Sequence, residues 1–283
     1  MFSRKFAATS VAGALLLSLS AVAPAAAAPP PGYTCTGDLA SPGFIPAGTY
    51  TRLTMPAGSF CVITDGRITV KHRTWLGRGA LLFVVGGKLT LHGGLTVGRD
   101  AGFGAGVYGP IGPLKIDGSV DVKKGGVFFV GLEDPYGPIS TTIRGSLTAH
   151  DASAVVIHNT DVRGSVTVRG GGGANAVVEA MFGPGLNYSD FEDSRIHGSF
   201  SETGFRGIWG GVIRSKIWGR FTFSHNVQPV DGAGEYDIGW NVIFGSATCS
   251  QNKPAPNLGD SPGGSSIVHG RIRGNQAATC FGL

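Results

Sequence analysis

Acidic side chains that could do chemistry gather in one short segment of this sequence, SDFEDSR, at residues 189–195. Several carboxylates together can hold Ca²⁺, and a pair of them can act as general acid and base in glycoside hydrolysis. In an extended segment, alternation would place Glu192 opposite Asp193, so we expect only two of its three acids to share a face. A solvated loop accounts for the same residues and is the interpretation that we favour.

Two further acids belong to a recurring five-residue unit: a glycine, any residue, an apolar, a polar and an apolar residue. Asp121 and Glu202 occupy or adjoin the outward polar position of that unit. No group of residues shows the spacing of a catalytic or metal site, so we assign neither. If the protein is an enzyme, the candidate residues are Asp121, Asp190, Glu192, Asp193, Arg195 and Glu202.

The unit recurs about every 25 residues, and such a period is the sequence signature of a solenoid. Its apolar residues alternate with a period of two, as in Val166 and Val168, and that period predicts strands. The 48 glycines and 16 prolines of the chain would break a helical repeat. We therefore predict an all-β fold, a single-domain right-handed parallel β-helix. The units begin at Gly66, Gly87, Gly118, Gly145, Gly164, Gly198, Gly219, Gly245 and Gly270.

A second apolar element precedes the glycine, as in VVIHNTDVRG before Gly164, so we expect each coil to contain a second strand. GALLFVVGG and GGVFFVG are predicted to be fully buried strands. Polar residues stand a few positions before the glycine, where they could turn the chain, and Gly164 itself would lie at a coil corner. These polar residues are Asn159, Asp193, Ser215 and Asn241.

The outward polar position of the unit is most often threonine, and stacked coils would arrange these residues as one ladder. They are Thr69, Thr90, Thr148, Thr167, Thr222 and Thr248. A regular threonine ladder resembles an ice-binding face, but threonine is also simply favoured on the exposed side of a strand. Ice binding usually needs a second file of threonine. The neighbouring position holds Arg67, Lys88, Arg220 and serines instead, so we do not favour ice binding.

The first 27 residues are predicted to be a secretory signal peptide. Arg4 and Lys5 precede an apolar run from Val11 to Val22, and an Ala-x-Ala site ends at Ala27. No later apolar run approaches the ~20 residues of a membrane-spanning helix. We expect a secreted, extracellular protein without a membrane span, and a monomer.

The mature chain would be mildly basic, because removal of Arg4 and Lys5 lowers the formal net charge from +5 to about +3. Its basic residues are scattered singly along the sequence, whereas binding to a phosphate backbone requires them on one face. We therefore expect no nucleic-acid partner.

Four cysteines, Cys35, Cys61, Cys249 and Cys280, would meet an oxidising environment after secretion, and their even number predicts two disulfides. Three pairings are open on the sequence alone. We favour Cys35 with Cys61 and Cys249 with Cys280, because each pair lies at one end of the chain and would staple a terminus.

These features resemble right-handed parallel β-helix proteins of the pectate-lyase-like type, and more specifically secreted actinobacterial β-helix proteins of unassigned function. The resemblance rests on an N-terminal block CTGDL…PAGTYTRLTMPAGSFC, on coils like VRGSVTV, and on a C-terminal block CSQNKPAPNLG…VHGRIRGNQAATC. It covers most of the chain from Cys35 to Cys280, and the two cysteine blocks are its more specific part. It implies the fold but supplies no catalytic residues.

We expect four parts: a signal peptide (1–27), an N-terminal disulfide-containing cap (28–65), parallel β-helix coils (66–248) and a C-terminal disulfide-containing cap segment (249–283). The scarcity of acids favours a secreted or cell-surface structural or binding module without a cofactor, whose partner is a cell-wall or extracellular polysaccharide. The alternative is a carbohydrate-active polysaccharide lyase or hydrolase of the same fold. Only that lyase would require Ca²⁺.

Overall fold

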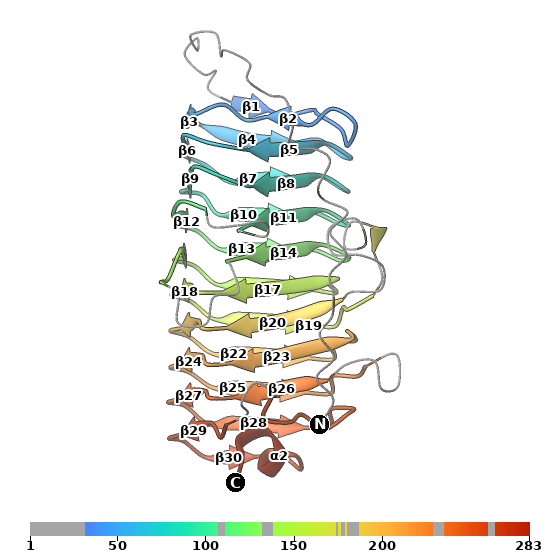
Figure 1. The fold of residues 1–283 in the computed structure, drawn as a ribbon, viewed down its shortest axis with the longest axis vertical. Coiled ribbons are helices and arrows are strands. Elements are labelled where there is room, and N and C mark those ends of the chain that lie inside the picture. Colours follow the sequence, from blue (N-terminus) through green and yellow to red (C-terminus); the bar gives the residue numbers. More distant parts are fainter. Residues whose placement is uncertain are drawn as a thin grey trace, which may run out of the picture.

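The computed structural model describes residues 32–106, 111–131, 138–173, 175, 176, 179, 187–228, 235–259 and 264–283. The predicted signal peptide (1–27) lies outside the described residues. Within them, thirty short strands and one short helix, α2 (Ala277–Phe281), form a parallel β-solenoid, which confirms the predicted fold class. Figure 1 shows its coils stacked along one axis. In this part of the chain no helix has both the length and the apolar character that crossing a bilayer requires.

The strands belong to three parallel sheets, which we call sheets A, B and C. Sheet A contains β1 (Gly32–Thr34), β4 (Arg52–Met55), β7 (Thr74–Leu76), β10 (Leu95–Val97), β13 (Val120–Val122), β16 (Leu147–His150), β19 (Val166–Arg169), β22 (Phe200–Thr203), β25 (Phe221–Ser224), β28 (Ala247–Ser250) and β30 (Ile272–Arg273). Sheet B contains β2 (Gly43–Phe44), β5 (Phe60–Ile63), β8 (Leu81–Val84), β11 (Gly102–Ala105), β14 (Val127–Val130), β17 (Ala154–His158), β20 (Tyr188–Glu192), β23 (Trp209–Ile213) and β26 (Tyr236–Gly239). Sheet C contains β3 (Gly48–Tyr50), β6 (Arg67–Val70), β9 (Lys88–Leu91), β12 (Leu114–Ile116), β15 (Thr141–Ile143), β18 (Thr160–Val162), β21 (Arg195–Ile196), β24 (Lys216–Ile217), β27 (Val242–Ile243) and β29 (Ile267–Val268).

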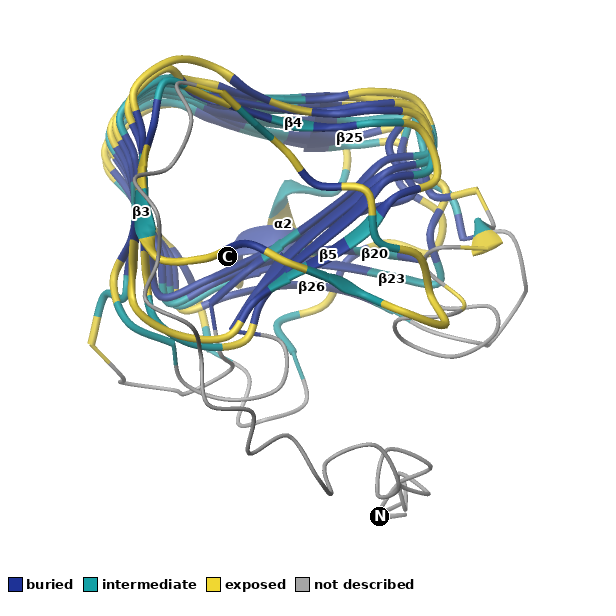
Figure 2. Cartoon of the chain, turned by 90° about the horizontal axis from the view of Figure 1, so that it is seen from above, coloured by how far each residue is buried: buried dark blue, intermediate teal, exposed yellow. Residues whose placement is uncertain are grey.

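A typical coil runs from sheet A to sheet B to sheet C, and the three sheets enclose the hydrophobic core (Figure 2). The sequence led us to expect two strands in each coil, and the structure has three. In a strand such as β19, Val166 and Val168 point inward and are fully buried, whereas Thr167 points outward. Alternation along each strand therefore supplies the core from all three sides.

The recurring glycine units do not all lie on one face. The strands that follow Gly66 and Gly87 belong to sheet C, whereas those that follow the later glycines belong to sheet A. The expected threonine ladder is therefore split, with Thr69 beside Thr90 on sheet C and Thr148 beside Thr167 on sheet A. A single ladder was a wrong prediction, because alignment on glycine cannot tell one corner of a three-sided coil from another.

Gly164 lies at a corner between sheets C and A, where successive coils approach closely. A Cβ atom added there would lie 2.4 Å from the Ser146 Oγ and 2.7 Å from the Gly145 carbonyl oxygen. The Ser146 hydroxyl accepts a hydrogen bond from the Ser165 backbone N–H at 3.1 Å, so it cannot move aside freely. Only glycine fits this corner, as expected.

Polar residues turn the chain between sheets B and C, as expected. Asn159 and Asp193 adopt the left-handed conformation, with φ of 46° and 51°. The buried Ser215 backbone N–H donates a hydrogen bond to the Asn241 side-chain oxygen at 3.0 Å, linking one coil to the next. These bonds satisfy backbone groups that strand pairing leaves unpaired at the corner.

Both predicted disulfides are confirmed: Cys35 pairs with Cys61 and Cys249 with Cys280. The second bond attaches α2, which lies across the opening of the solenoid in Figure 2. Phe281 of α2 is fully buried, and its ring centroid lies 5.8 Å from that of Phe221. The role of residues 28–65 and 249–283 as caps stays a prediction.

Candidate functional site

Asp121 and Glu202 lie on opposite sides of sheet A. Asp121 points outward, with the Lys123 Nζ atom 2.6 Å and an Arg73 guanidinium nitrogen 3.7 Å from its carboxylate. Glu202 points inward and has no exposed surface. Our expectation that Glu202 lies on or beside the outer face was wrong, because Phe200 takes the preceding inward position of β22 and alternation then directs Glu202 into the core.

Glu202 is a carboxylic acid inside the solenoid. The Ser189 hydroxyl, from sheet B, donates a hydrogen bond to it. Burial raises the pKa of Glu202 to about 8; the Ser189 hydrogen bond opposes this rise, and the nearby Asp190 carboxylate adds to it. The side chain is thus protonated at neutral pH and is closed off from any ligand outside.

The other three candidate acids meet on the outward side of sheet B. The His158 Nε2 and Asp190 Oδ2 atoms lie 2.8 Å apart. Arg214 donates hydrogen bonds to Asp193 at 2.8 Å and a further one to Glu192. We expected Glu192 and Asp193 on opposite faces, but the left-handed Asp193 ends the alternation, so both carboxylates reach one guanidinium.

This polar cluster contains groups that acid–base catalysis uses, but its side chains are largely buried. A histidine bonded to a carboxylate is a common proton-transfer pair. His158 is only 4% and Glu192 only 7% exposed, however. The hydrogen bonds that Arg214 donates to Asp193, together with the Glu192 charge, raise the pKa of Arg214, so its guanidinium stays charged at all ordinary pH values.

Arg195 is separated from the acids that precede it in the sequence. It lies in β21 on the outward side of sheet C, beside Asp161 of the neighbouring coil. The candidate residues therefore occupy four places: the outside of sheet A, the core, the outside of sheet B and the outside of sheet C. Among the described residues, no group of three or more His, Cys, Asp or Glu side chains could hold a metal ion.

Sheet C carries a feature that the candidate acids did not indicate. In seven consecutive coils, from β6 to β24, every coil places at least one lysine or arginine on its outward side. Backbone pairing holds the sheet C strands in register, so the basic residues lie in three neighbouring columns. Arg67 is paired with Lys88 and Arg195 with Lys216, whereas Lys115 is paired with Thr90. We call them the basic face: Arg67, Lys71, Lys88, Lys115, Arg144, Arg163, Arg195 and Lys216. At about 4.8 Å per coil, the basic face extends for roughly 30 Å along the left edge of the solenoid in Figure 1.

Two aspartates offset part of this charge. Asp117 contacts Lys115 at 3.2 Å and Arg144 at 3.3 Å, and it lies 2.6 Å from His92. Burial acts to raise the pKa of Asp117, but hydrogen bonds from His92 and Lys115 lower it below its ordinary value, so the carboxylate stays charged.

Asp161 in turn contacts Arg163 at 2.8 Å and His197 at 2.9 Å. Eight basic side chains against these two acids leave a formal excess of six positive charges on this part of the described surface. This exceeds the formal net charge of +5 of the whole sequence. Sheet C therefore concentrates the positive charge of the protein.

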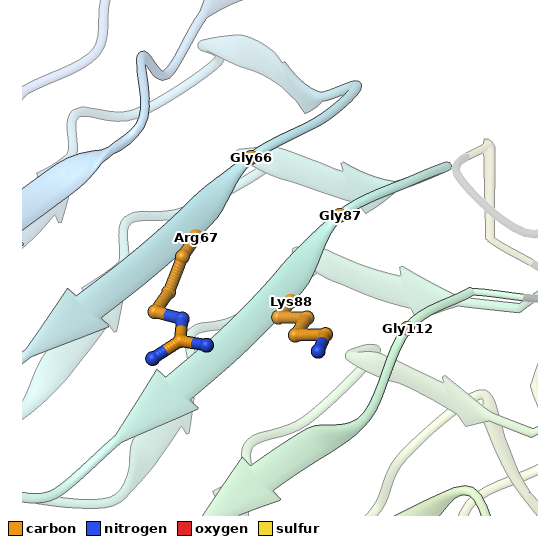
Figure 3. Close-up of a pocket in the computed structure, with 5 residues that line it drawn as sticks. All are labelled: Gly66, Arg67, Gly87, Lys88 and Gly112. Carbon is orange, nitrogen blue, oxygen red and sulfur yellow. The ribbon is translucent and has the colours of Figure 1, made fainter.

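Residues of the first three coils of the basic face line a shallow pocket of about 360 Å³. Figure 3 shows Arg67 and Lys88 projecting side by side from neighbouring strands, with Gly66, Gly87 and Gly112 along the rim. The described residues offer Arg67 and Lys88 no ion-pair partner. Two unpaired cations above glycine backbone can accept an anionic group such as a carboxylate, sulfate or phosphate.

Sequence reasoning missed the basic face because, apart from Arg67 and Lys71, its successive members stand 17 to 32 residues apart and look scattered. The coil topology brings them together, so the premise on which we excluded nucleic acid does not hold for this surface. A signal did exist: a basic residue recurs beside each apolar pair of the sheet C strands, as in RITV and KLTL.

Comparison of the chain with protein-family models, with curated proteins and with solved structures finds no match in any of the three. The β-solenoid class therefore rests on the structure itself.

Proposed function

We propose that this chain is a secreted, non-catalytic binding module that binds an acidic extracellular polysaccharide along the basic face. The observation that carries this proposal is the unbroken series of seven coils with a lysine or arginine on the outward side of sheet C. A linear polyanion can meet such a series at many points, and many weak charge contacts on one rigid surface add up to useful affinity.

Secretion and a polysaccharide partner belong to the same proposal. Two disulfides suit an oxidising compartment, and the sequence predicts a signal peptide at residues 1–27. Acidic glycans are the common long polyanions outside cells. The resemblance to pectate-lyase-like β-helix proteins agrees with a glycan partner, and an actinobacterial origin stays part of the proposal.

Binding can be tested with the purified mature protein and a panel of soluble glycans. We expect measurable affinity for alginate and chondroitin sulfate, and none for the neutral glycans dextran and starch. The variant R67E/K88E should lose at least about tenfold in affinity, because each reversal changes the charge of the face by two. Equal binding of acidic and neutral glycans would contradict the proposal.

A matched control reverses two charges on sheet A. Arg52 and Arg169 are exposed there and belong to no ion pair within the described residues. The variant R52E/R169E changes the total charge by the same amount as R67E/K88E and should bind acidic glycans nearly as well as the wild-type protein. Equal losses in the two variants would show that only net charge matters.

A carbohydrate-active lyase or hydrolase is the second candidate function, and the His158–Asp190 pair beside Glu192 is the observation that favours it. Release of oligosaccharides from acidic glycans, with and without Ca²⁺, would test it. Product release by the wild-type protein and its loss in Asp190→Asn would replace the non-catalytic proposal. A wild-type protein that binds the glycan and leaves its length unchanged supports the binding module.

A further inference from the structure

The outward surface of sheet C changes its chemistry towards the C-terminal end. Two of the outward columns continue in register towards the C-terminal end with exposed apolar side chains. One runs from Lys216 to Val242 and Ile267, and the other from Trp218 to Phe244 and then His269. Trp218 is 39%, Phe244 44% and Ile267 58% exposed, and Val242 lies half-buried between them. We call Trp218, Val242, Phe244 and Ile267 the apolar patch. Contiguous exposed apolar patches on soluble proteins are often interaction sites.

Aromatic rings of the patch are not arranged to hold a sugar. Trp218 stacks on His197 at 4.4 Å with an interplanar angle of 3°, and Phe244 stacks on His269 at 5.1 Å with an angle of 6°. Trp218 and Phe244 also stack on each other, at 5.6 Å and 20°. The ring faces are therefore covered by neighbouring rings, and ring edges face outward. Stacking on a sugar needs a free ring face.

Contact with an alkyl chain does not require a free ring face. Apolar contact is non-directional and depends on the area removed from water, so ring edges and the Ile267 side chain serve it equally well. The patch also adjoins the cations Arg195 and Lys216 without a break in the columns. The complementary ligand has an anionic part followed by an apolar part.

We infer that the ligand of sheet C is amphipathic, an acidic glycan joined to an acyl or alkyl group. The glycan lies along the basic face and the apolar group lies over the apolar patch. This inference rests on the proposed function and adds the lipid-like part of the ligand to it. A bare anionic lipid surface and a second copy of the chain are the competing occupants.

A matched pair of probes tests the inference: an alginate oligosaccharide, and the same oligosaccharide with one dodecyl group at its reducing end, both below micelle-forming concentration. The dodecyl group should tighten the Kd for the wild-type protein by at least about tenfold, as burial of a few methylene groups does. The variant W218S/F244S/I267S should lose that gain and keep the wild-type Kd for the unmodified oligosaccharide. The variant R67E/K88E should bind both probes more weakly.

A single variant, Ile267→Ser, guards against misfolding of the triple variant, because the Ile267 side chain is mostly exposed. This variant should lose part of the affinity that the dodecyl group adds. Equal Kd values of the two probes for the wild-type protein would overturn the inference and leave the proposed function intact. Binding of neither probe would overturn both.

Separate measurements test the two competing occupants, an anionic lipid surface and a second copy of the chain. Phosphatidylglycerol vesicles that bind as tightly as the dodecyl oligosaccharide would assign sheet C to a lipid surface and overturn the inference. Wild-type dimers that W218S/F244S/I267S dissociates in sedimentation experiments would assign the apolar patch to a second copy and overturn it as well. Vesicle binding at least about tenfold weaker, with a monomeric wild-type protein, supports the amphipathic glycan.

Discussion

The Ser189 hydroxyl of sheet B donates a hydrogen bond to the Glu202 carboxyl group of sheet A inside the solenoid, and neither side chain has exposed surface. Glu202 occupies a core position that holds Val168 in the preceding coil and Phe223 in the following one. Burial of an ionised carboxylate there would be costly, so the group keeps its proton. Burial of this one carboxyl group makes the stability of the fold depend on pH.

Glu202→Gln should stabilise the protein at pH 8 and have little effect at pH 4. The pKa of Glu202 is raised from 4.5 to about 8, so the folded state keeps a proton that the unfolded state releases between these values. The contribution of Glu202 to folding is therefore greatest at low pH and falls as the pH rises from about 4.5 to 8. Glutamine keeps the shape and avoids that loss, which is up to about 4 kcal/mol at pH 8. Melting temperatures of both proteins across this range check the prediction, and parallel curves would contradict it.

Gly164→Ala should lower the free energy of unfolding by about 1–3 kcal/mol, the usual cost of forced overpacking. The new Cβ would collide with the Ser146 Oγ and with backbone of the preceding coil. Gly173→Ala is the matched control, because no atom lies within 4 Å of a Cβ placed there. Chemical denaturation measures both, and a Gly164→Ala protein as stable as the Gly173→Ala control would show that the corner can relax.

Removal of the C-terminal disulfide in C249A/C280A should destabilise the end of the solenoid. The bond closes a loop between residues 31 apart in sequence, which in the loop-entropy model stabilises folding by roughly 3–4 kcal/mol. It also attaches α2, whose Phe281 is buried against Phe221. We expect a lower melting temperature and faster proteolysis near α2. An unchanged melting temperature would mean that this segment does not cap the core.

Asp117→Asn should strengthen binding to acidic glycans. The substitution removes a negative charge from the basic face and releases Lys115 and Arg144 from their ion pairs. Asp121→Asn on sheet A removes the same charge elsewhere and should leave the affinity nearly unchanged. Because the pKa of Asp117 is lowered, its carboxylate is charged throughout the range from pH 5 to 8, and the gain should persist across it. Isothermal titration with alginate measures the difference, and no gain from Asp117→Asn would place the ligand elsewhere.

Local patterns in the sequence were enough for the fold class. The period of two in segments such as GSVTV predicts strands, the recurrence predicts a solenoid, and the positions of the cysteines led to the correct disulfides. Local patterns in the sequence did not indicate that the coils form three sheets. The sheet C strands are often only two or three residues long, as in β24 (Lys216–Ile217), and alternation needs more residues than that to be recognised.

The surface chemistry was harder to predict for a related reason. Asp121 and Glu202 stand at neighbouring positions of the same repeating unit. Alternation along the strand directs the position of Asp121 outward and the next position, which Glu202 occupies, into the core. The basic face is a property of stacking: Arg67, Arg144 and Lys216 are distant in sequence and become a single surface once the coils are in register. Loops of unequal length between the coils hide that register in the sequence.

The salt dependence of glycan binding shows whether the ligand lies along the basic face. Binding of a polyanion along the basic face releases counterions, so the logarithm of the association constant should fall steeply and linearly with the logarithm of the salt concentration. The variant R67Q/K88Q/R195Q/K216Q removes four contacts and should flatten this slope by roughly 0.7 to 0.9 for each contact, as found for other polyanions. The variant R52Q/R169Q/R220Q/R273Q removes four charges from the sheet A side and should keep the wild-type slope. Equal slopes for the two variants would contradict the claim that sheet C is the binding surface.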